Sequence, residues 1–317
     1  MKKILLLGII LIFTCSPSFA GDDDFSFIVI SNTNKSIIRE VNLIKPDLVF
    51  QTGRTLEDHG AIETSLHLVP GCPDQETERT YSSFKYKNIC FIILNSETTG
   101  NDQVEWLKKE LQHQKDDRAT FVFLHRPLMA PLGERTDEKN RELIELLVEN
   151  KVASVFSGHD LPSYTRDYKG TSFVTVGGQN NYALITIKGN KFKTDIMEPF
   201  RLSVEQSYEE TDDGKAIGKA LINNRQGDPL MSLIELRGIV FRLPKGNYLL
   251  HAESEATDEQ MNSIQQALGM LLPDLSGLLA PAIYKTEDSK NAPGMIDVWV
   301  RINAPGTLPT KLVVEPE

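Results

Sequence analysis

The sequence predicts an α/β domain followed by a smaller C-terminal domain that is either α+β or mostly β. Three observations lead to this prediction. Over the first 200 residues, short apolar, β-branched runs alternate with segments of helical hydrophobic spacing. Polar residues cluster just beyond the ends of the apolar runs, where open α/β sheets place their sites. A polar, acidic stretch at residues 201–214 then separates this part from the rest.

The expected strands of the first part are short apolar runs, and its expected helices carry apolar residues on one face. Val104, Leu107 and Leu111 recur at helical spacing after Asp102, an acidic helix start. We expect the last two strands to pair with each other before a turn at residues 188–190. The expected strands are 25–31, 46–50, 65–69, 89–94, 120–124, 153–156, 173–176 and 182–187, and the expected helices are 35–44, 103–112 and 137–150.

We interpret the acidic stretch 201–214 as a solvated linker and residues 215–317 as a C-terminal domain of unknown type. Thr257 and Gln260 form a capping box for an expected helix at residues 258–272. The remaining apolar runs predict strands, the last of them at a sheet edge. These strands are 233–243, 248–252, 296–302 and 311–314.

Composition and charge exclude several classes of protein. The chain has 317 residues, of which 40% are hydrophobic, and this is enough apolar material for a packed core. Its 34 Lys and Arg against 44 Asp and Glu give a net charge of -10. Phosphates and anionic membrane surfaces attract basic faces, so we expect no nucleic-acid partner. A protein partner is the alternative that this composition permits.

Residues 1–20 have the features of a secretory signal peptide. Lys2 and Lys3 precede an apolar run at residues 4–13, which is too short to span a bilayer core of ~30 Å. Small residues then lead to Ala20, after which we expect cleavage. The sequence therefore predicts export to the periplasm or the cell exterior and a mature chain with no transmembrane segment.

The three cysteines leave two questions open. Cys15 is the acylated residue if the N-terminus is instead that of a lipoprotein. After cleavage at residue 20 only Cys72 and Cys90 remain, and an oxidising compartment allows them to form a disulfide. Alternatively, Cys90 is a buried apolar residue of the run 89–94 and Cys72 is free.

Five short motifs, in the same order along the chain, resemble those of the calcineurin-like metallophosphoesterases. The family has D-x-H, GDxxD, GNHD, H-x-P and GHxH. At the corresponding places this chain has NTN at 32–34, GRTLE at 53–57, GCPD at 71–74, HRP at 125–127 and GHDL at 158–161. The resemblance implies a four-layer α/β/β/α sandwich over residues 21–200. It also implies an ancestral site where two divalent metals activate a water for attack on phosphorus.

Most positions that correspond to the family's metal ligands are substituted. Asn32 and Asn34 replace Asp and His, and a neutral amide is a weaker ligand. Arg54 replaces the Asp that bridges the two metals. A guanidinium has no lone pair to offer and adds positive charge where two cations would already repel each other. The first metal and the bridge are therefore expected to be lost.

The second metal site is also degenerate. Cys72 replaces an Asn ligand, Pro73 replaces the His that protonates the leaving group, and Leu161 replaces the last His. Asp74 completes the degenerate set. Of the family's seven ligand positions, two keep the residue that the family has, and both belong to the second metal. They are His125 and His159.

Three hypotheses follow. The first is a pseudoenzyme without a cofactor, in which the phosphoesterase domain is a binding or structural scaffold. The second is a residual phosphoester hydrolase that uses His125 and His159 with one divalent metal (Zn, Mn or Fe) or none. The third is an adaptor that binds a partner through residues 215–317. Arg54 either pairs with a nearby carboxylate or forms a metal-free anion site with His125 and His159.

Overall fold

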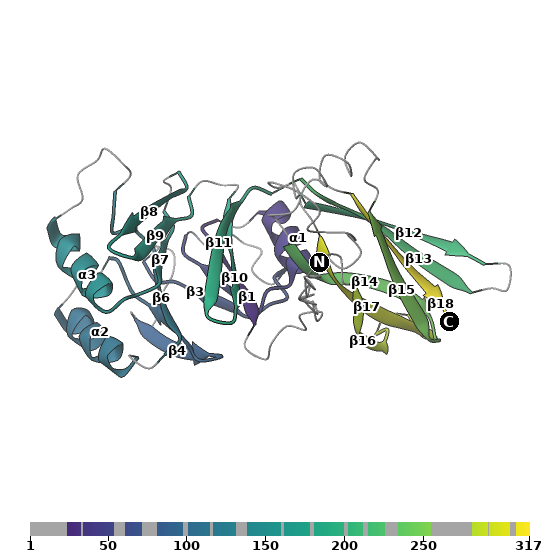
Figure 1. The fold of residues 1–317 in the computed structure, drawn as a ribbon, viewed down its shortest axis with the longest axis horizontal. Coiled ribbons are helices and arrows are strands. Elements are labelled where there is room, and N and C mark those ends of the chain that lie inside the picture. Colours follow the sequence, from purple (N-terminus) through teal and green to yellow (C-terminus); the bar gives the residue numbers. More distant parts are fainter. Residues whose placement is uncertain are drawn as a thin grey trace, which may run out of the picture.

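Two β-sheets packed face to face form the centre of the first part of the molecule (Figure 1). The five-stranded sheet has the order β11-β10-β1-β2-β3, and the six-stranded sheet has the order β4-β5-β6-β7-β9-β8. The computed structural model describes residues 24–32, 34–53, 61–71, 81–97, 101–114, 117–130, 138–159, 162–177, 181–199, 202–211, 215–225, 234–254, 281–290, 292–304 and 309–317.

The strands of the five-stranded sheet are β1 (Phe25–Ile30), β2 (Leu48–Gln51), β3 (Leu66–Leu68), β10 (Tyr182–Lys188) and β11 (Lys191–Met197). Those of the six-stranded sheet are β4 (Ser82–Tyr86), β5 (Ile89–Ile93), β6 (Ala119–Leu124), β7 (Ser154–Ser157), β8 (Tyr164–Tyr168) and β9 (Thr171–Thr175). The described helices are α1 (Lys35–Ile44), α2 (Asn101–His113) and α3 (Glu138–Glu149).

Strand β1 shows why the central strands are apolar along their whole length. Its odd-numbered residues, including Phe27 and Val29, enter the aromatic core between the two sheets. Its even-numbered residues Ile28 and Ile30 enter the core on the opposite face, together with α1. Both faces are buried, so a continuous apolar run replaces the alternation of a half-exposed strand.

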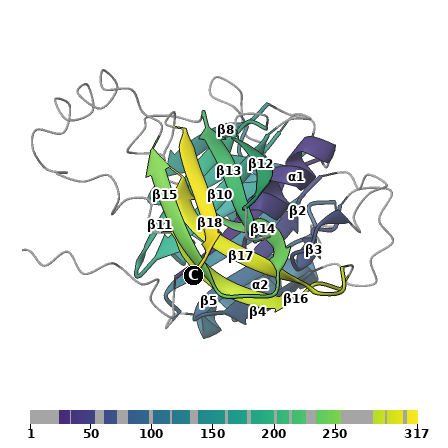
Figure 2. The ribbon, with the colours of Figure 1, turned by 90° about the vertical axis from the view of Figure 1, so that its right-hand side faces the viewer.

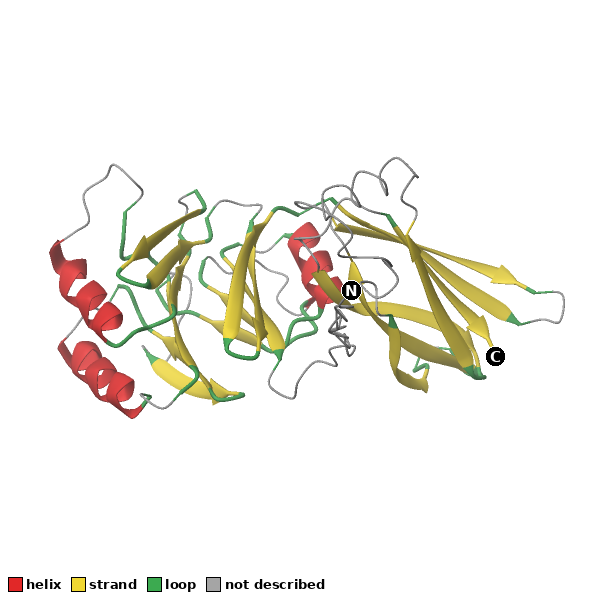
Figure 3. Ribbon diagram, in the orientation of Figure 1, coloured by secondary structure: helices red, strands yellow, loops and turns green. Residues whose placement is uncertain are grey.

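The first part has four layers, as the sequence predicts. Helices α2 and α3 cover the outer face of the six-stranded sheet through a core that includes Leu107, Leu111 and Leu147. Helix α1 covers the outer face of the five-stranded sheet (Figure 3). The order of layers is therefore α/β/β/α. No helix in the described ranges is long and apolar enough to cross a membrane.

The described residues of the second part of the chain form β-strands and the turns between them, as the mostly β alternative predicts. A four-stranded sheet of order β12-β13-β18-β15 packs against a three-stranded sheet of order β14-β17-β16, and all of the pairs are antiparallel (Figure 2). The strands are β12 (Leu202–Glu210), β13 (Ala216–Asn224), β14 (Ile234–Pro244), β15 (Tyr248–Ser254), β16 (Ala282–Asp288), β17 (Met295–Ala304) and β18 (Thr310–Pro316).

The interpretation of residues 201–214 as a linker is wrong for most of its length. Residues 202–210 form β12, which pairs with β13 from Leu202 opposite Asn224 to Glu210 opposite Ala216. Residues 205–210 of this edge strand are exposed, so polar and acidic side chains are tolerated there. The acidic composition therefore reflects the solvent exposure of one end of this edge strand.

Two further strand predictions are wrong. β9 and β10 do not pair with each other, because β9 lies between β7 and β8 in one sheet and β10 lies between β1 and β11 in the other. β18 is not an edge strand, since it lies between β13 and β15. The expected helix at residues 258–272 and the expected signal peptide lie outside the described residues.

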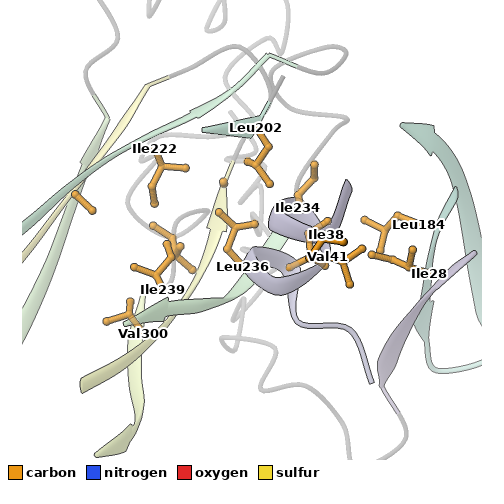
Figure 4. Packing of buried hydrophobic residues seen from close by; sticks show 14 of the residues in the cluster. Ile28, Ile38, Val41, Leu184, Leu202, Ile222, Ile234, Leu236, Ile239 and Val300 are labelled. Carbon is orange, nitrogen blue, oxygen red and sulfur yellow. The ribbon is translucent and has the colours of Figure 1, made fainter. Parts of the chain in front are cut away.

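Helix α1 connects the two parts of the molecule. It packs on the five-stranded sheet with one side and on β14 with another, so a single apolar cluster extends from Ile28 through Val41 to Val300 (Figure 4). At the bulge of β14, a Cβ on Gly238 would lie 1.8 Å from the carbonyl oxygen of Asn42, so only glycine allows this approach. Helix α1 is therefore a layer that both parts of the molecule share.

Candidate functional site

The candidate site lies where adjacent parallel strands of the six-stranded sheet end. β5, β6 and β7 are parallel neighbours, so the residues that follow them meet at one edge. Glu97 lies a few residues beyond β5, His125 directly follows β6, and His159 lies just beyond β7. Thr52 follows β2 of the other sheet and faces the same place.

His125 is buried and connects the two sheets. Its side chain is only 4% exposed, and its Nδ1 lies 2.7 Å from the backbone carbonyl oxygen of Thr52. Because a carbonyl only accepts, Nδ1 carries the proton. Burial lowers the pKa of His125, and the positive charge of Arg126 acts in the same direction, whereas the Thr52 hydrogen bond and the charge of Glu97 oppose them. The imidazole is therefore neutral at neutral pH.

His159 lies between His125 and an arginine. Its Nδ1 is 3.3 Å from His125 Nε2, with the two rings edge to face at 81° and 5.2 Å between centroids. Its Nε2 is 3.3 Å from Arg126 Nη1. The backbone of His159 has a φ of 70°, in the left-handed region. Its two ring contacts are both with residues that directly follow β6.

Arg126 is held by two further contacts from the loop after β5. Its Nε forms a short ion pair with Glu97 Oε1. Its backbone N–H donates to Ser96 Oγ over 3.0 Å. The side chain of Arg126 is half exposed, so the guanidinium contacts solvent on one side and His159 on the other.

Asn34 serves a structural purpose at the position where the family resemblance places a metal ligand. Its Oδ1 accepts hydrogen bonds from the backbone N–H groups of Ser36, at 3.0 Å, and Ile37, at 2.9 Å. It is the N-cap of α1 and satisfies two of the donors that a helix start leaves free. The oxygen that would bind a metal is therefore already used. Asn32 lies in the preceding turn and is partly buried.

The strand ends are packed closely around these residues. A Cβ on Gly158 would lie 2.6 Å from Thr52 Oγ1 and 3.0 Å from Ser31 Oγ, so this glycine lets β7 approach the ends of β1 and β2. The hydroxyl of Ser31 is fully buried, and no hydrogen-bond partner is found for it in the described part of the chain. Backbone and small side chains thus fill the space between the two sheets at this edge.

The structure brings together only some of the residues that the sequence singled out. His125 and His159 are in contact, whereas Asn34 points its oxygen into α1. Four substituted positions lie outside the described residues, namely Arg54, Cys72, Pro73 and Leu161, and so does Asp74. Of the three residues in the hypothetical anion site, the structure therefore describes His125 and His159 but not Arg54.

Sequence reasoning missed Thr52, Ser96, Glu97 and Arg126 as parts of the site. The signal for Arg126 was its place between His125 and Pro127, and Ser96 and Glu97 follow an apolar run. Within the described ranges, no group of three or more His, Cys, Asp or Glu side chains is arranged to hold a metal ion.

No family model and no curated protein matches this sequence. Solved structures of the metallophosphoesterase fold are similar to just over half of the chain. GAP50, the anchor in the inner membrane complex of Plasmodium, has a TM-score of 0.45 and 12% identity over 55% of this chain and 84% of its own. A predicted phosphoesterase from Streptococcus pneumoniae has a TM-score of 0.33 and 14% identity over 55% and 90%. Vps29 from Entamoeba histolytica, complexed with zinc, has a TM-score of 0.32 and 12% identity over 55% and 98%.

Proposed function

We propose that this chain is a metal-independent pseudo-phosphoesterase, exported from the cell, that acts as a binding or structural scaffold. One observation carries the proposal. Every ring nitrogen of His125 and His159, the two retained ligand positions, already has a hydrogen-bond partner within the protein. A metal ion would have to displace these partners before it could bind.

These hydrogen bonds occupy the lone pairs that a metal ion would need. A histidine binds a metal through a deprotonated ring nitrogen whose lone pair is free. His125 Nδ1 is protonated toward the Thr52 carbonyl, and its Nε2 faces His159. His159 Nε2 faces the Arg126 guanidinium, which only donates. Neither ring therefore offers a free lone pair.

The other positions support the same conclusion. The amide oxygen of Asn34 caps α1, so using it as a ligand would leave the helix start unsatisfied. Arg54, Pro73 and Leu161 have no side-chain atom that could bind a cation. The half-exposed Arg126 donates to His159 Nε2, so a metal ion at this nitrogen would have to displace the guanidinium.

Export is proposed from the sequence of residues 1–20, with its two lysines, apolar run and small residues before the expected cleavage at Ala20. The measurement is the N-terminus of the protein recovered from the periplasm or the medium. An N-terminus at Gly21 supports export. A retained N-terminus on a cytoplasmic protein contradicts it, and a lipid on Cys15 identifies the lipoprotein alternative.

The first test is metal stoichiometry by elemental mass spectrometry, after incubation with Mn, Fe and Zn and removal of excess ion. We expect fewer than about 0.1 equivalents, because the ring nitrogens of His125 and His159 already have hydrogen-bond partners. A metalloenzyme of this class needs its ion to generate the nucleophile. The same preparation should show no metal-dependent turnover of aryl phosphomonoesters or phosphodiesters. His251→Ala, which changes an exposed histidine paired with Glu315, is the matched control.

About one equivalent of metal that disappears in His125→Ala but persists in His251→Ala would contradict the proposal. It would favour the residual one-metal hydrolase, for which the 5.2 Å separation of the two imidazole rings is the supporting observation. Metal-dependent turnover that requires both His125 and His159 would establish that alternative.

A further inference from the structure

We infer that Arg126 takes the place of a metal ion at this site. Together with His159, His125 and the Thr52 carbonyl, it forms a directed series of hydrogen bonds, here called the imidazole relay, that ties the two sheets together. The inference rests on the proposed function and deepens it, because it says what the two histidines do in a protein that does not use them as ligands.

The direction of the imidazole relay is fixed at both ends. The Arg126 guanidinium can only donate, so His159 Nε2 must accept. The Thr52 carbonyl can only accept, so His125 Nδ1 must donate. A neutral imidazole has one donor and one acceptor. His159 Nδ1–H therefore donates to His125 Nε2, and both rings are in the Nδ1–H tautomer.

The imidazole relay connects one strand end of the five-stranded sheet to two neighbouring strand ends of the six-stranded sheet. Thr52 directly follows β2 of the five-stranded sheet, whereas His125 and Arg126 follow β6 of the six-stranded sheet. His159 adds the end of β7, and the Arg126 ion pair with Glu97 adds the loop after β5. A side chain fixed in this way connects the two sheets as a bound ion would.

The charges in this arrangement compensate one another. Glu97 neutralises Arg126, and the two imidazoles are neutral in the arrangement that the hydrogen bonds require. A buried polar group is stable when it is hydrogen-bonded, so the 4%-exposed His125 needs no additional cation. Arg126 thus provides both the positive charge and the donor that the lone pair of His159 needs.

The test is the tautomeric state of the histidines in the full chain, measured without metal near pH 8 by nitrogen-15 NMR of the imidazole rings. The signals of His125 and His159 are assigned from single variants. We expect both rings as Nδ1–H, with the nitrogen shifts of a protonated Nδ1 and an unprotonated Nε2. Either ring in the Nε2–H form would overturn the inference.

Arg126→Met tests whether the arginine sets this order. We expect the His159 nitrogen shifts to move toward a mixture of tautomers, because its acceptor loses the donor that fixes it. Arg242→Met is the matched control, since Arg242 is also a half-exposed arginine paired with a carboxylate, Asp297, but contacts neither histidine. Unchanged His159 shifts in Arg126→Met would overturn the inference.

His159→Asn is a second variant that does not depend on Arg126. Asparagine tolerates the positive φ of this position, so the backbone can be kept. We expect the His125 Nε2 shift to change while its Nδ1 proton, bonded to Thr52, remains. An unchanged His125 Nε2 would show that the two rings do not interact.

The two proposals fail in different ways. Nε2–H rings in a protein without metal-dependent turnover would remove the imidazole relay and leave the pseudoenzyme proposal standing. Nδ1–H rings in a protein that hydrolyses phosphoesters with metal would keep the imidazole relay and contradict the proposed function. Zinc at one equivalent should leave the shifts of both rings unchanged.

Discussion

Arg237 Nη2 lies 2.9 Å from Asp47 Oδ2, so the bulge of β14 is bonded to the loop that joins α1 to β2. Asp47 also accepts from the backbone N–H of Ser26 at 3.0 Å and from the hydroxyl of Tyr86 at 3.2 Å. Both members of the ion pair are largely buried, at 27% and 15% exposure. One carboxylate thus receives donors from the five-stranded sheet, the six-stranded sheet and the C-terminal sandwich.

Replacing Arg237 should weaken the joint between the two parts. Arg237→Met removes a charge-assisted hydrogen bond and leaves Asp47 partly buried with two remaining donors, so we expect a loss of about 1–2 kcal/mol in the free energy of unfolding. The measurement is urea denaturation. Arg242→Met breaks a more exposed pair within the sandwich and should cost less. Equal losses in the two variants would argue against a special role for the Arg237 pair.

Glycine is required at position 238 by the close approach of β14 to α1. A Cβ there would lie 1.8 Å from the Asn42 carbonyl oxygen and 2.9 Å from Leu43 Cα, both backbone atoms that cannot turn aside. We expect Gly238→Ala to cost about 1–3 kcal/mol through displacement of the helix. Gly246→Ala in the same sandwich meets its nearest atom at 3.7 Å and should stay within about 0.5 kcal/mol of the parent. Denaturation midpoints that fall equally would refute this explanation.

The shared apolar cluster predicts that the two parts unfold together. The chain has two tryptophans, Trp106 in α2 and Trp299 in β17, so Trp106→Phe leaves one fluorophore in the sandwich. Far-UV circular dichroism at the helix band reports on the described helices, α1 to α3, which lie in the first part. We expect the thermal transitions by fluorescence and by circular dichroism to coincide in this variant. Two separate midpoints would mean that the parts are independent.

The capping role of Asn34 can be separated from a role in metal binding. Asn34→Ala removes both capping hydrogen bonds and should lower the free energy of unfolding by about 1 kcal/mol. Asn34→Ser retains a capping oxygen and should recover most of this loss. Asn34→His restores the residue of the family motif, and we expect it to destabilise without adding bound metal. Metal uptake by Asn34→His would contradict the structural assignment.

Cys90 should be unreactive in the folded protein. It is a free thiol that is fully buried in β5, and burial raises its pKa to about 12. At pH 8 roughly one thiol in ten thousand is then ionised, and the thiolate is the reactive form. We expect alkylation mass spectrometry to find the peptide with Cys90 unmodified in the native protein and modified in denaturant. Rapid native labelling would show that the strand opens.

The spacing of apolar residues predicted the central helices and strands well, because the apolar residues of these elements are the ones that are buried. The helix expected at residues 35–44 has these bounds in the structure, since Ile37, Val41 and Ile44 all face a core. β12 was missed for the opposite reason. Its outer half is exposed on both faces, so it lacks the alternation of a half-buried strand, and its sequence resembles that of a loop.

The site could be predicted only where a motif contained it. His125 and His159 follow apolar runs, and the structure places their rings in contact. The role of Arg126 depends on β5, β6 and β7 being neighbours, an order that no local pattern specifies. The capping by Asn34 was visible in principle, because asparagine just before a helix is a common N-cap.

The position of α1 between two packed surfaces limits how this segment can vary in sequence. A helix at a protein surface usually has a broad solvated side on which substitutions are neutral. In α1, only Lys35 and Arg39 are exposed among ten residues. Saturation mutagenesis should therefore find nearly the whole of α1 intolerant, whereas α2 should accept changes along its outer side. Lineages that alter α1 would need to alter β14 in step.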